Sequence, residues 1–493
     1  MGSEVKPAKG LRSWAPRHLN AGFVAGFLLV LLTYLVVSRQ FAMDTPTDVT
    51  RTAPLIDEKE MMPTKAPAEA DAEQEKMEQK WQPKETPKNT SGAVPTEEFP
   101  KADSTEAKPL EKGKVACSSN GFYSDTCDVD GDVRTNGTAL SVTLVPASWS
   151  ERHEWKIQPY PRRTVSGIQE VIVTQLAAPD DQAAPACTVT HSVPAVVFAL
   201  GGLTGNYWHD FSDVLVPLFV ASRQYGGEVQ FLISNIQPWW LGKYEAIVRR
   251  LSSYDAVDLD HDKEVRCFRH VTVGLRMHKE FDVAPELAPS GLTMADFTAF
   301  LRETYSLPRA SPVSLRESPE KRPRLVVIHR THYRKLVNTD EVVRAAEAAG
   351  FEAVVMEPRF DARLEEVARE VNSFDAMVGV HGAGLTNAVF LPAGAVVIQV
   401  VPYGRLEPMA KADFGDPVAD MGLRYLQYSI AAEESTLLEM LGPEHPVVKD
   451  PEGVHRSGWD KVAEYYLGKQ DVRINVGRFA PTLALAFHHL RHR

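Results

Sequence analysis

The chain has 493 residues, 44% of them hydrophobic and 24% charged, and a formal net charge of −11. This apolar content excludes a wholly disordered chain, and four cysteines in such a length exclude a disulfide-dense miniprotein. The acidic balance argues against a nucleic-acid binder, which carries a basic excess. At about 150 residues per domain, the length allows roughly three units.

The first distinctive segment is residues 21–37, AGFVAGFLLVLLTYLVV, which carries no charge. Its length is close to the lower limit of about 17 residues for a membrane-spanning helix. Basic residues exceed acidic ones before it, so we expect residues 1–20 to be a cytosolic tail and the remainder to be luminal. A cleaved signal peptide is the alternative, but no Ala-x-Ala site directly follows Val37.

The next segment, residues 38–112, has a different composition. From Asp44 onward it is rich in Pro, Glu, Lys, Thr and Ala, and its aromatic residues are Trp81 and Phe99. Such a segment cannot bury enough apolar surface to offset its chain entropy. It is predicted to be a disordered luminal stem, which gives the layout of a single-pass type II membrane protein.

Two features fit a secretory lumen. Asn89 and Asn136 each begin an Asn-x-Ser/Thr sequon for N-glycosylation. All four cysteines follow the stem, and an oxidising compartment favours disulfides over free thiols. Four cysteines permit three pairings; joining the first two would close a short local loop and leave the other two as a pair. The candidates are Cys117, Cys127, Cys187 and Cys267.

The remaining chain is predicted to form two α/β domains, at 113–305 and 324–493. Residues 306–323, SLPRASPVSLRESPEKRP, are polar and proline-rich and are predicted to be a linker. In the first domain, strand-like runs at 171–176, 195–200 and 229–234 alternate with helix-like segments at 214–225, 244–251 and 294–305. In the second, strands at 325–329, 353–356, 376–380 and 395–401 alternate with helices at 338–349 and 364–373. This alternation predicts two Rossmann-like, doubly wound domains that face a cleft, with a helix at the C-terminus.

The strand at 376–380 is followed by His381, Gly382, Ala383 and Gly384, and then by a possible helix start. A glycine turn before a helix offers free backbone N–H groups to an anion. Arg330 and Arg334 follow another strand end, where open α/β sheets bind ligands, and arginine pairs well with phosphate. Asn338 is expected to support these arginines, and with Glu341 three residues later it also forms a capping-box pattern.

The run from Gly205 to Asp213, GNYWHDFSD, also follows a predicted strand. His209 and Asp213 are four residues apart, so they lie on one face of a helix if a helix begins at this run. A carboxylate that orients an imidazole makes it a better general base, and Asp210 is the rival candidate. Three DxD patterns, at 128–130, 258–260 and 260–262, follow no apolar strand directly, so we interpret them as turn and loop residues rather than metal ligands.

The stretch VGVHGAGLTNAVFLPAGAVVIQVVP resembles the signature of plant glycosyltransferase family 61. The resemblance extends from Cys117 to the C-terminus. It includes the motifs CDVDGDVR, GNYWHDFSDVLVPLF, WLGKY, EES and QDVR, and Arg330, Arg334 and Asn338.

This resemblance implies a GT-B-like fold and an inverting glycosyltransferase of the Golgi membrane, which transfers arabinofuranose or xylose from a UDP-sugar onto xylan. No cofactor is implied, and a divalent metal is not expected to be essential. The implied partners are a UDP-sugar, xylan or another glycan, and the Golgi membrane, but not nucleic acid; complexes with other Golgi glycosyltransferases are a further expectation. The expected catalytic residues are His209, Asp213 and Asp210; the expected nucleotide-sugar ligands are Arg330, Arg334, Asn338, His381, Gly382, Ala383, Gly384 and Glu434; and the expected acceptor contacts are Trp239, Trp240 and Tyr244.

Three alternatives remain open. Some relatives add xylose to the core of N-glycans, which makes a core β-1,2-xylosyltransferase the first alternative. A non-catalytic glycan-binding scaffold would bind xylan but not UDP. A metal-dependent GT-A transferase would depend on one of the DxD pairs.

Overall fold

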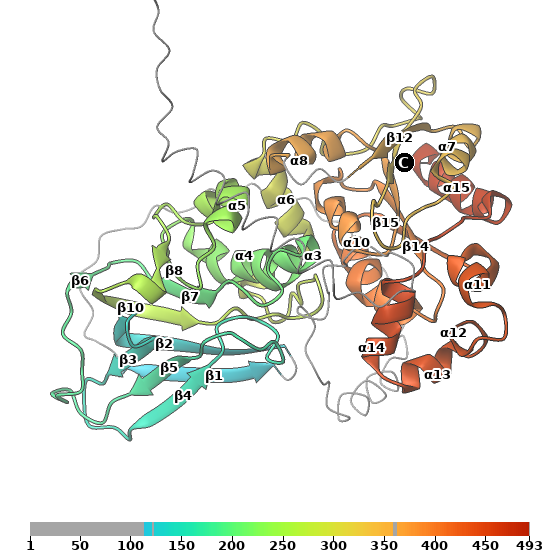
Figure 1. Cartoon of the computed structure of the whole chain (residues 1–493). Helices are drawn as coiled ribbons and strands as arrows, with labels where there is room; N and C mark the ends of the chain where they lie inside the picture. Colours follow the sequence, from blue (N-terminus) through green and yellow to red (C-terminus); the bar gives the residue numbers. More distant parts are fainter. Residues whose placement is uncertain (1–112, 121–122, 358–361, 493) are drawn as a thin grey trace, which may run out of the picture. The chain divides into compact units, whose positions relative to one another are not determined.

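The computed structural model describes residues 113–120, 123–357 and 362–492, which form two sheets with their helices (Figure 1). The expected cytosolic tail, membrane anchor and stem, including Asn89, lie outside the described residues. Within the described residues, no helix is both long enough and apolar enough to cross a membrane.

The second half contains a five-stranded, fully parallel sheet in the order β12-β11-β13-β14-β15. Its strands are β11 (Arg324–Ile328), β12 (Glu352–Met356), β13 (Ala376–Val380), β14 (Val396–Val401) and β15 (Arg424–Ser429). Its longer helices are α7 (Thr339–Ala348), α8 (Leu364–Asn372) and α15 (Val476–Arg491). The parallel sheet predicted from the apolar runs is therefore present, with one further strand, β15.

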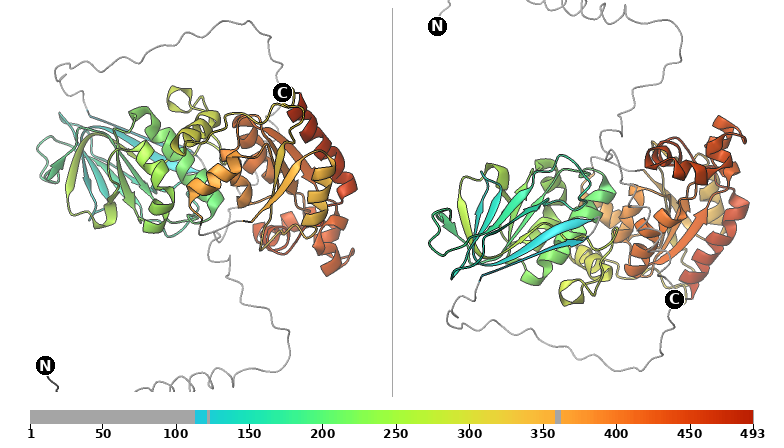
Figure 2. Two further views of the ribbon diagram at one scale, coloured as in Figure 1. Left: turned by 90° about the horizontal axis from the view of Figure 1, so that it is seen from above. Right: turned by 90° about the horizontal axis from the view of Figure 1, so that it is seen from below.

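Helices cover both faces of this sheet, as a doubly wound arrangement requires. On β11, Leu325 and Val327 pack with residues of α7 and α15, whereas Val326 and Ile328 face the core that includes residues of α8. Figure 2 shows α15 lying along the outer side of the sheet. Alternate residues of the strands are thus buried on opposite faces, which explains why their sequences are almost continuously apolar.

Shorter helical segments complete the second half. They are η6 (Ala383–Phe390), α9 (Glu407–Ala410), η7 (Lys411–Gly415), α10 (Asp416–Asp420), η8 (Ala432–Glu434), α11 (Thr436–Leu441), α12 (Pro446–Lys449), α13 (Pro451–Arg456), α14 (Trp459–Val462) and η9 (Ala463–Leu467).

The first half contains a ten-stranded mixed sheet whose main path is β4-β5-β3-β2-β10-β7-β8-β9. Its strands are β1 (Lys114–Asn120), β2 (Ser124–Asn136), β3 (Ser141–Val145), β4 (His153–Ile157), β5 (Val171–Gln175), β6 (Val189–Thr190), β7 (Ala195–Ala199), β8 (Gln230–Ser234), β9 (Val257–Asp258) and β10 (Val265–Val273). Strands β7, β8 and β9 are parallel, but β2 runs antiparallel to β1, β3 and β10.

The helical segments of this half are α3 (Tyr207–His209), η2 (Asp210–Leu215), α4 (Val216–Ser222), η3 (Arg223–Tyr225), α5 (Pro238–Leu251), η4 (Leu259–His261), η5 (Pro289–Gly291) and α6 (Met294–Thr304). Figure 1 shows α4, α5 and α6 on one side of β7, β8 and β10. On β7, Val196 and Phe198 pack into the core with these helices, whereas Ala195 and Val197 pack with residues of β2, β3 and β5. The expected doubly wound sheet is therefore wrong for this half, because antiparallel strands cover the face where a second helical layer was predicted.

Two disulfides are present, and the described residues contain no free cysteine. Cys117 and Cys127 are direct partners in the β1–β2 ladder and are bonded to each other. Cys187 is bonded to Cys267 on β10, which closes a loop across 80 residues. The bonds join the pairs that the local-loop argument favoured.

One apolar core contains residues of both halves, including Phe198 and Phe219 from the first and Ile328 and Phe390 from the second. Residues 306–323 contain no helix or strand. Within them, Arg309 bonds to Asn372 and pairs with Asp375 of the second half. The limits proposed for the two domains stay a prediction.

Candidate active site

A glycine after β13 lies against two arginines. Gly382 has a φ of +141°, and an added Cβ would collide with the Arg330 guanidinium and lie 3.1 Å from Nη2 of Arg334. Arg330 is oriented by its Nε, which donates to the Tyr333 carbonyl at 2.8 Å. Both guanidiniums therefore lie over the Gly382 backbone, where two permanently cationic groups can bind a diphosphate.

His381 is buried beside this glycine and is held in one orientation. Its Nδ1 accepts a hydrogen bond from the Gln399 amide at 2.8 Å, and the Tyr425 hydroxyl donates to the Gln399 carbonyl oxygen at 2.8 Å. Burial, followed by the charges of Arg334 and Arg330, lowers the pKa of His381 to about 3. The imidazole is therefore neutral with its hydrogen on Nε2, which lies 3.7 Å from Oδ2 of Asp413.

The segment after the glycine turn is a 3₁₀ helix, η6, rather than the expected α-helix start. The side-chain oxygen Oδ1 of Asn387, on η6, accepts a hydrogen bond from the Tyr207 hydroxyl at 3.0 Å. On the next residue of α3, the indole N–H of Trp208 donates to the Asp413 backbone carbonyl at 3.4 Å. These contacts bring the loop after β13 next to the GNYWHDFSD segment.

His209 and Asp213 form the predicted pair. Nδ1 of His209 lies 3.0 Å from Oδ2 of Asp213, which also accepts bonds from the Tyr160 hydroxyl at 2.9 Å and from Nε of Arg162 at 2.8 Å. Burial alone would raise the pKa of Asp213, but Arg162 and His209 outweigh it and hold that pKa at about 2. An ionised Asp213 can only accept, so Nδ1 of His209 carries hydrogen, and in the neutral imidazole Nε2 then presents a lone pair.

Asp210 is fully buried and its carboxylate is already engaged within the fold. Oδ1 accepts the Gly205 backbone N–H at 2.9 Å and the Trp240 indole N–H at 3.0 Å. Oδ2 accepts the Tyr244 hydroxyl at 2.8 Å and lies 3.7 Å from Nζ of Lys243. Asp210 thus ties the Gly205 loop to α5, which suits it poorly to the role of base.

Two of the three expected acceptor contacts are wrong. Trp240 and Tyr244 are 0% exposed, and their polar atoms bond to Asp210, so neither ring has a face open to a sugar. Trp239 differs, because it is 50% exposed and lies against Gly205. Of the three, Trp239 alone presents a ring surface to solvent.

Two expected nucleotide-sugar ligands are engaged elsewhere. The Asn338 amide donates to Glu341 at 2.9 Å and to the Ile474 carbonyl at 2.9 Å, and its oxygen accepts the Ile474 N–H at 3.0 Å. Helix α7 begins after Asn338 as expected, but Asn338 caps no N–H of that helix, so the capping box is wrong. Through its bonds to Ile474, Asn338 holds the chain that leads into α15.

Glu434 is also saturated by the fold. Its carboxylate accepts the backbone N–H groups of Ala431 at 2.9 Å and Asn475 at 2.6 Å, the Tyr428 hydroxyl, and the Arg478 guanidinium. The side chain is 4% exposed. The expected ribose contact is therefore corrected to a structural role, in which Glu434 links η8 to the start of α15.

A cavity of about 520 Å³ lies beside the loop that carries the two arginines. Cationic side chains gather on its wall together with the first residues of α7. The lining is formed by His329, Lys335, Leu336, Val337, Asn338, Thr339, Asp340, Glu341, Arg344 and Arg473. The cavity has the volume of a small-ligand site.

The comparison with known proteins identifies the family. The profile described as glycosyltransferase 61 matches residues 207–398, from the GNYWHDFSD segment through β14. Rice (Oryza sativa subsp. japonica) β-1,2-xylosyltransferase XYXT1 is 46% identical over 76% of this chain and 84% of its own length. The chain belongs to glycosyltransferase family 61. Rice α-1,3-arabinosyltransferase XAT3 is 44% identical over 76% of this chain and 66% of its own length, and the Arabidopsis thaliana xylan glycosyltransferase MUCI21 is 33% identical over 76% and 79%. The protein is therefore a glycosyltransferase.

In this family 61 member, the acidic pairs bond within the fold. Asp128 and Asp130 lie on strand β2, not in a turn, and bond to Thr272 and His270 of β10. Asp260 accepts bonds from Ser234 and Asn235. Each pair thus has a structural partner in the described part of the chain.

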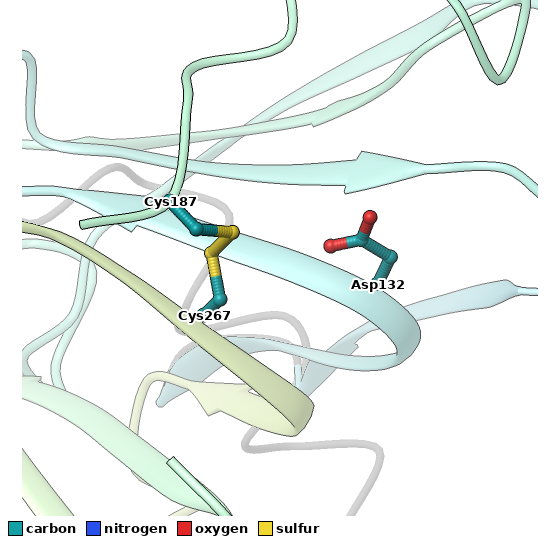
Figure 3. A group of neighbouring side chains, drawn as sticks. All are labelled: Asp132, Cys187 and Cys267. Carbon is teal, nitrogen blue, oxygen red and sulfur yellow. A yellow bond between two sulfur atoms is a disulfide. The ribbon is translucent and has the colours of Figure 1, made fainter. Parts of the chain in front are cut away.

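One further group has metal-ligand spacing in the described residues of the family 61 chain. Asp132, Cys187 and Cys267 have ligand atoms within 4.8 Å of one another (Figure 3). The two sulfur atoms are bonded to each other, and Asp132 pairs with Arg134 at 2.7 Å. A disulfide supplies no thiolate, so this group does not match a zinc site.

Sequence reasoning missed several residues of this glycosyltransferase site. Arg162 joins Asp213 to Glu280, and Asp413 lies next to His381. Neither Arg162 nor Asp413 follows an apolar strand, so no local pattern marks them. Gln399 was detectable, because a polar residue inside the buried run VVIQVV needs a partner.

Proposed function

We propose that this protein transfers a pentose, arabinofuranose or xylose, from a UDP-sugar onto xylan, with inversion at the anomeric carbon. The observation that carries the proposal is the similarity to enzymes named for xylosyl, arabinosyl and xylan transfer, over three quarters of the chain. The two arginines over Gly382 and the oriented His209 support the same chemistry. The two sheets are consistent with a GT-B-like arrangement, with the donor bound mainly by the second half.

The transfer needs a base on the acceptor side. In the proposed step, Nε2 of His209 takes the proton of an acceptor hydroxyl while that oxygen attacks the anomeric carbon. Asp213 orients the imidazole and stabilises the imidazolium that forms. Trp239 is the side chain we assign to acceptor contact.

The donor side must accept the charge of the leaving group. The bond from the anomeric carbon to the phosphate oxygen breaks, and the electron pair leaves with UDP. Arg330 and Arg334 neutralise this charge, together with backbone N–H groups of the turn from Gly382 to Gly384, whereas the His381 N–H already donates to the Val400 carbonyl. The cavity beside the loop that carries Arg330 and Arg334 supports a place for the rest of the nucleotide. Because these residues supply positive charge themselves, we expect no essential divalent metal.

We also propose a Golgi membrane location with the catalytic part in the lumen. The uncharged segment at 21–37, the sequon at Asn136 and the two disulfides support it, since disulfides form in oxidising compartments. Association with other Golgi glycosyltransferases stays a prediction.

The test is a donor and acceptor assay on the purified full-length protein. Xylo-oligosaccharides are incubated separately with UDP-arabinofuranose, UDP-xylose and UDP-GlcNAc, with and without EDTA, and product masses are measured. We expect a pentose gain that survives EDTA. Transfer abolished by EDTA would contradict metal independence. Xylose transfer to an N-glycan but not to xylan would favour the core xylosyltransferase, and xylan binding without transfer would favour a scaffold.

A further inference from the structure

Asp413 is a carboxyl group at the edge of the proposed diphosphate site. It lies on η7 and its Oδ2 is 3.7 Å from Nε2 of His381. The residue that follows His381 is Gly382, and the guanidinium groups of Arg330 and Arg334 lie over its backbone. The Asp413 carboxyl group therefore lies 3.7 Å from the side chain of the residue that precedes Gly382, and an ionised carboxylate there would repel a diphosphate bound at Gly382.

The surroundings of Asp413 disfavour its charged form. Its side chain is 19% exposed, and among the described residues His381 is the one basic side chain within 4 Å of its carboxylate. His381 is itself neutral for the reasons given above. Arg162 is nearby, but its guanidinium is bonded to Asp213 and Glu280.

The charged and titratable groups that face Asp413 come from both halves. Tyr123, Arg162 and Glu280 come from the first half, and His381 comes from the loop after β13. Burial first, and then the negative charge of Glu280, raise the pKa of Asp413 to about 8, against a smaller opposing effect of Arg162. A pKa of about 8 corresponds to a mostly protonated carboxyl group at pH 7, and the geometry places that group 3.7 Å from the His381 side chain, beside the proposed diphosphate site.

We propose that Asp413 is a neutral carboxylic acid that donates a hydrogen bond to the donor's diphosphate, so that nucleotide binding at alkaline pH takes up one proton. This inference rests on the proposed function. The proton comes from solvent and stays on Asp413, shared with a phosphate oxygen. Asp413 is therefore a binding residue whose role needs the acid form.

The test is calorimetric titration of the full-length protein with UDP between pH 7 and pH 9. Pairs of buffers with different ionisation enthalpies report proton uptake. The terminal phosphate of UDP ionises near pH 6, so its own titration is complete in this range. For the wild type we expect about half a proton taken up near pH 8, and affinity about tenfold weaker at pH 9 than at pH 7.

Asp413→Asn keeps a hydrogen-bond donor of the same shape that cannot ionise. We expect it to lose both the proton uptake and the dependence of affinity on pH. The control is Asp416→Asn, an exposed carboxylate that pairs with Lys411 and should keep the wild-type pH dependence. Thermal melting checks that each variant is folded.

The outcomes separate the two proposals. UDP binding without proton uptake, or unchanged uptake in Asp413→Asn, would overturn the role of Asp413 and leave the proposed function standing. No UDP binding by the folded wild type at any pH would overturn the proposed function itself, and the inference with it.

Discussion

Asp210 and Asp213 are both fully buried and lie three residues apart, but the groups that donate hydrogen bonds to their carboxylates are of different kinds. The donors to Asp210 come from a loop backbone and from core side chains of α5. The donors to Asp213 include the half-buried imidazole of His209, whose second ring nitrogen does not bond to Asp213 and can contact a substrate. The same side-chain type therefore holds the fold together at one position and, in the proposed mechanism, orients the base at the other.

At this scale, the prediction contrasts two variants. His209→Ala should lower kcat by about 10²- to 10⁴-fold, because a general base contributes that much, with little loss of stability. Asp210→Ala should instead lower the free energy of unfolding by about 3 kcal/mol or more, because it leaves several buried donors unsatisfied. Product formation at saturating substrate and urea denaturation measure the two effects. Full activity in His209→Ala would disprove its assignment as base.

At the scale of elements, the strand-to-turn junction after β13 explains why glycine is needed there. Any other residue at position 382 would have to adopt an unfavourable positive φ. Its Cβ would also displace the guanidinium groups of Arg330 and Arg334. The sequence pattern of a strand followed by Gly-x-Gly indicated an anion site. Which cations lie over it depended on how the loop after β11 folds back.

Gly382→Ala should therefore weaken UDP binding by at least about tenfold, equivalent to about 1.4 kcal/mol for displaced cations. Gly422→Ala is a matched control, since its φ is +76° and an added Cβ meets no atom within 4 Å. The Gly422→Ala variant has the same kind of backbone strain, an alanine at positive φ, but leaves Arg330 and Arg334 in place. Equal UDP affinity in both variants would show that the arginine contact at Gly382 does not matter.

The antiparallel strands of the first half show the limit of local patterns. Strand β2 has the sequence SDTCDVDGDVRTN, whose Asp and Gly residues are typical of turns. It is nevertheless a continuous strand, because β1 and β10 pair with it on either side and Val129 and Val133 are buried. Strand pairing with distant residues outweighed local preference.

At the scale of the whole described unit, one apolar core joins the two halves. Phe390 of η6 is fully buried and its ring contacts Phe211 and Tyr305 of the first half. The hydrogen bond from Tyr207 to Asn387 crosses the same boundary. The parts that we assign to donor and acceptor binding are therefore stabilised by shared packing.

Phe390→Ala should lower the free energy of unfolding by about 3–5 kcal/mol through the cavity that it leaves. Because the core is shared, we expect both halves to lose structure in one calorimetric transition, in the wild type and at a lower temperature in the variant. Two transitions, of which Phe390→Ala moves only one, would mean that the halves unfold independently.

The sequence by itself determined the parallel sheet of the second half, the pairing of His209 with Asp213, and membership of the family. These depend on apolar periodicity and on contiguous motifs, which are local. Only the tertiary structure decided that Asp210, Asn338 and Glu434 are held by the fold, that Trp240 and Tyr244 are buried, and that Asp413 lies beside His381. Such contacts join residues far apart in the chain (118 positions for Arg162 and Glu280), and their geometry follows from how the two sheets pack rather than from any local pattern.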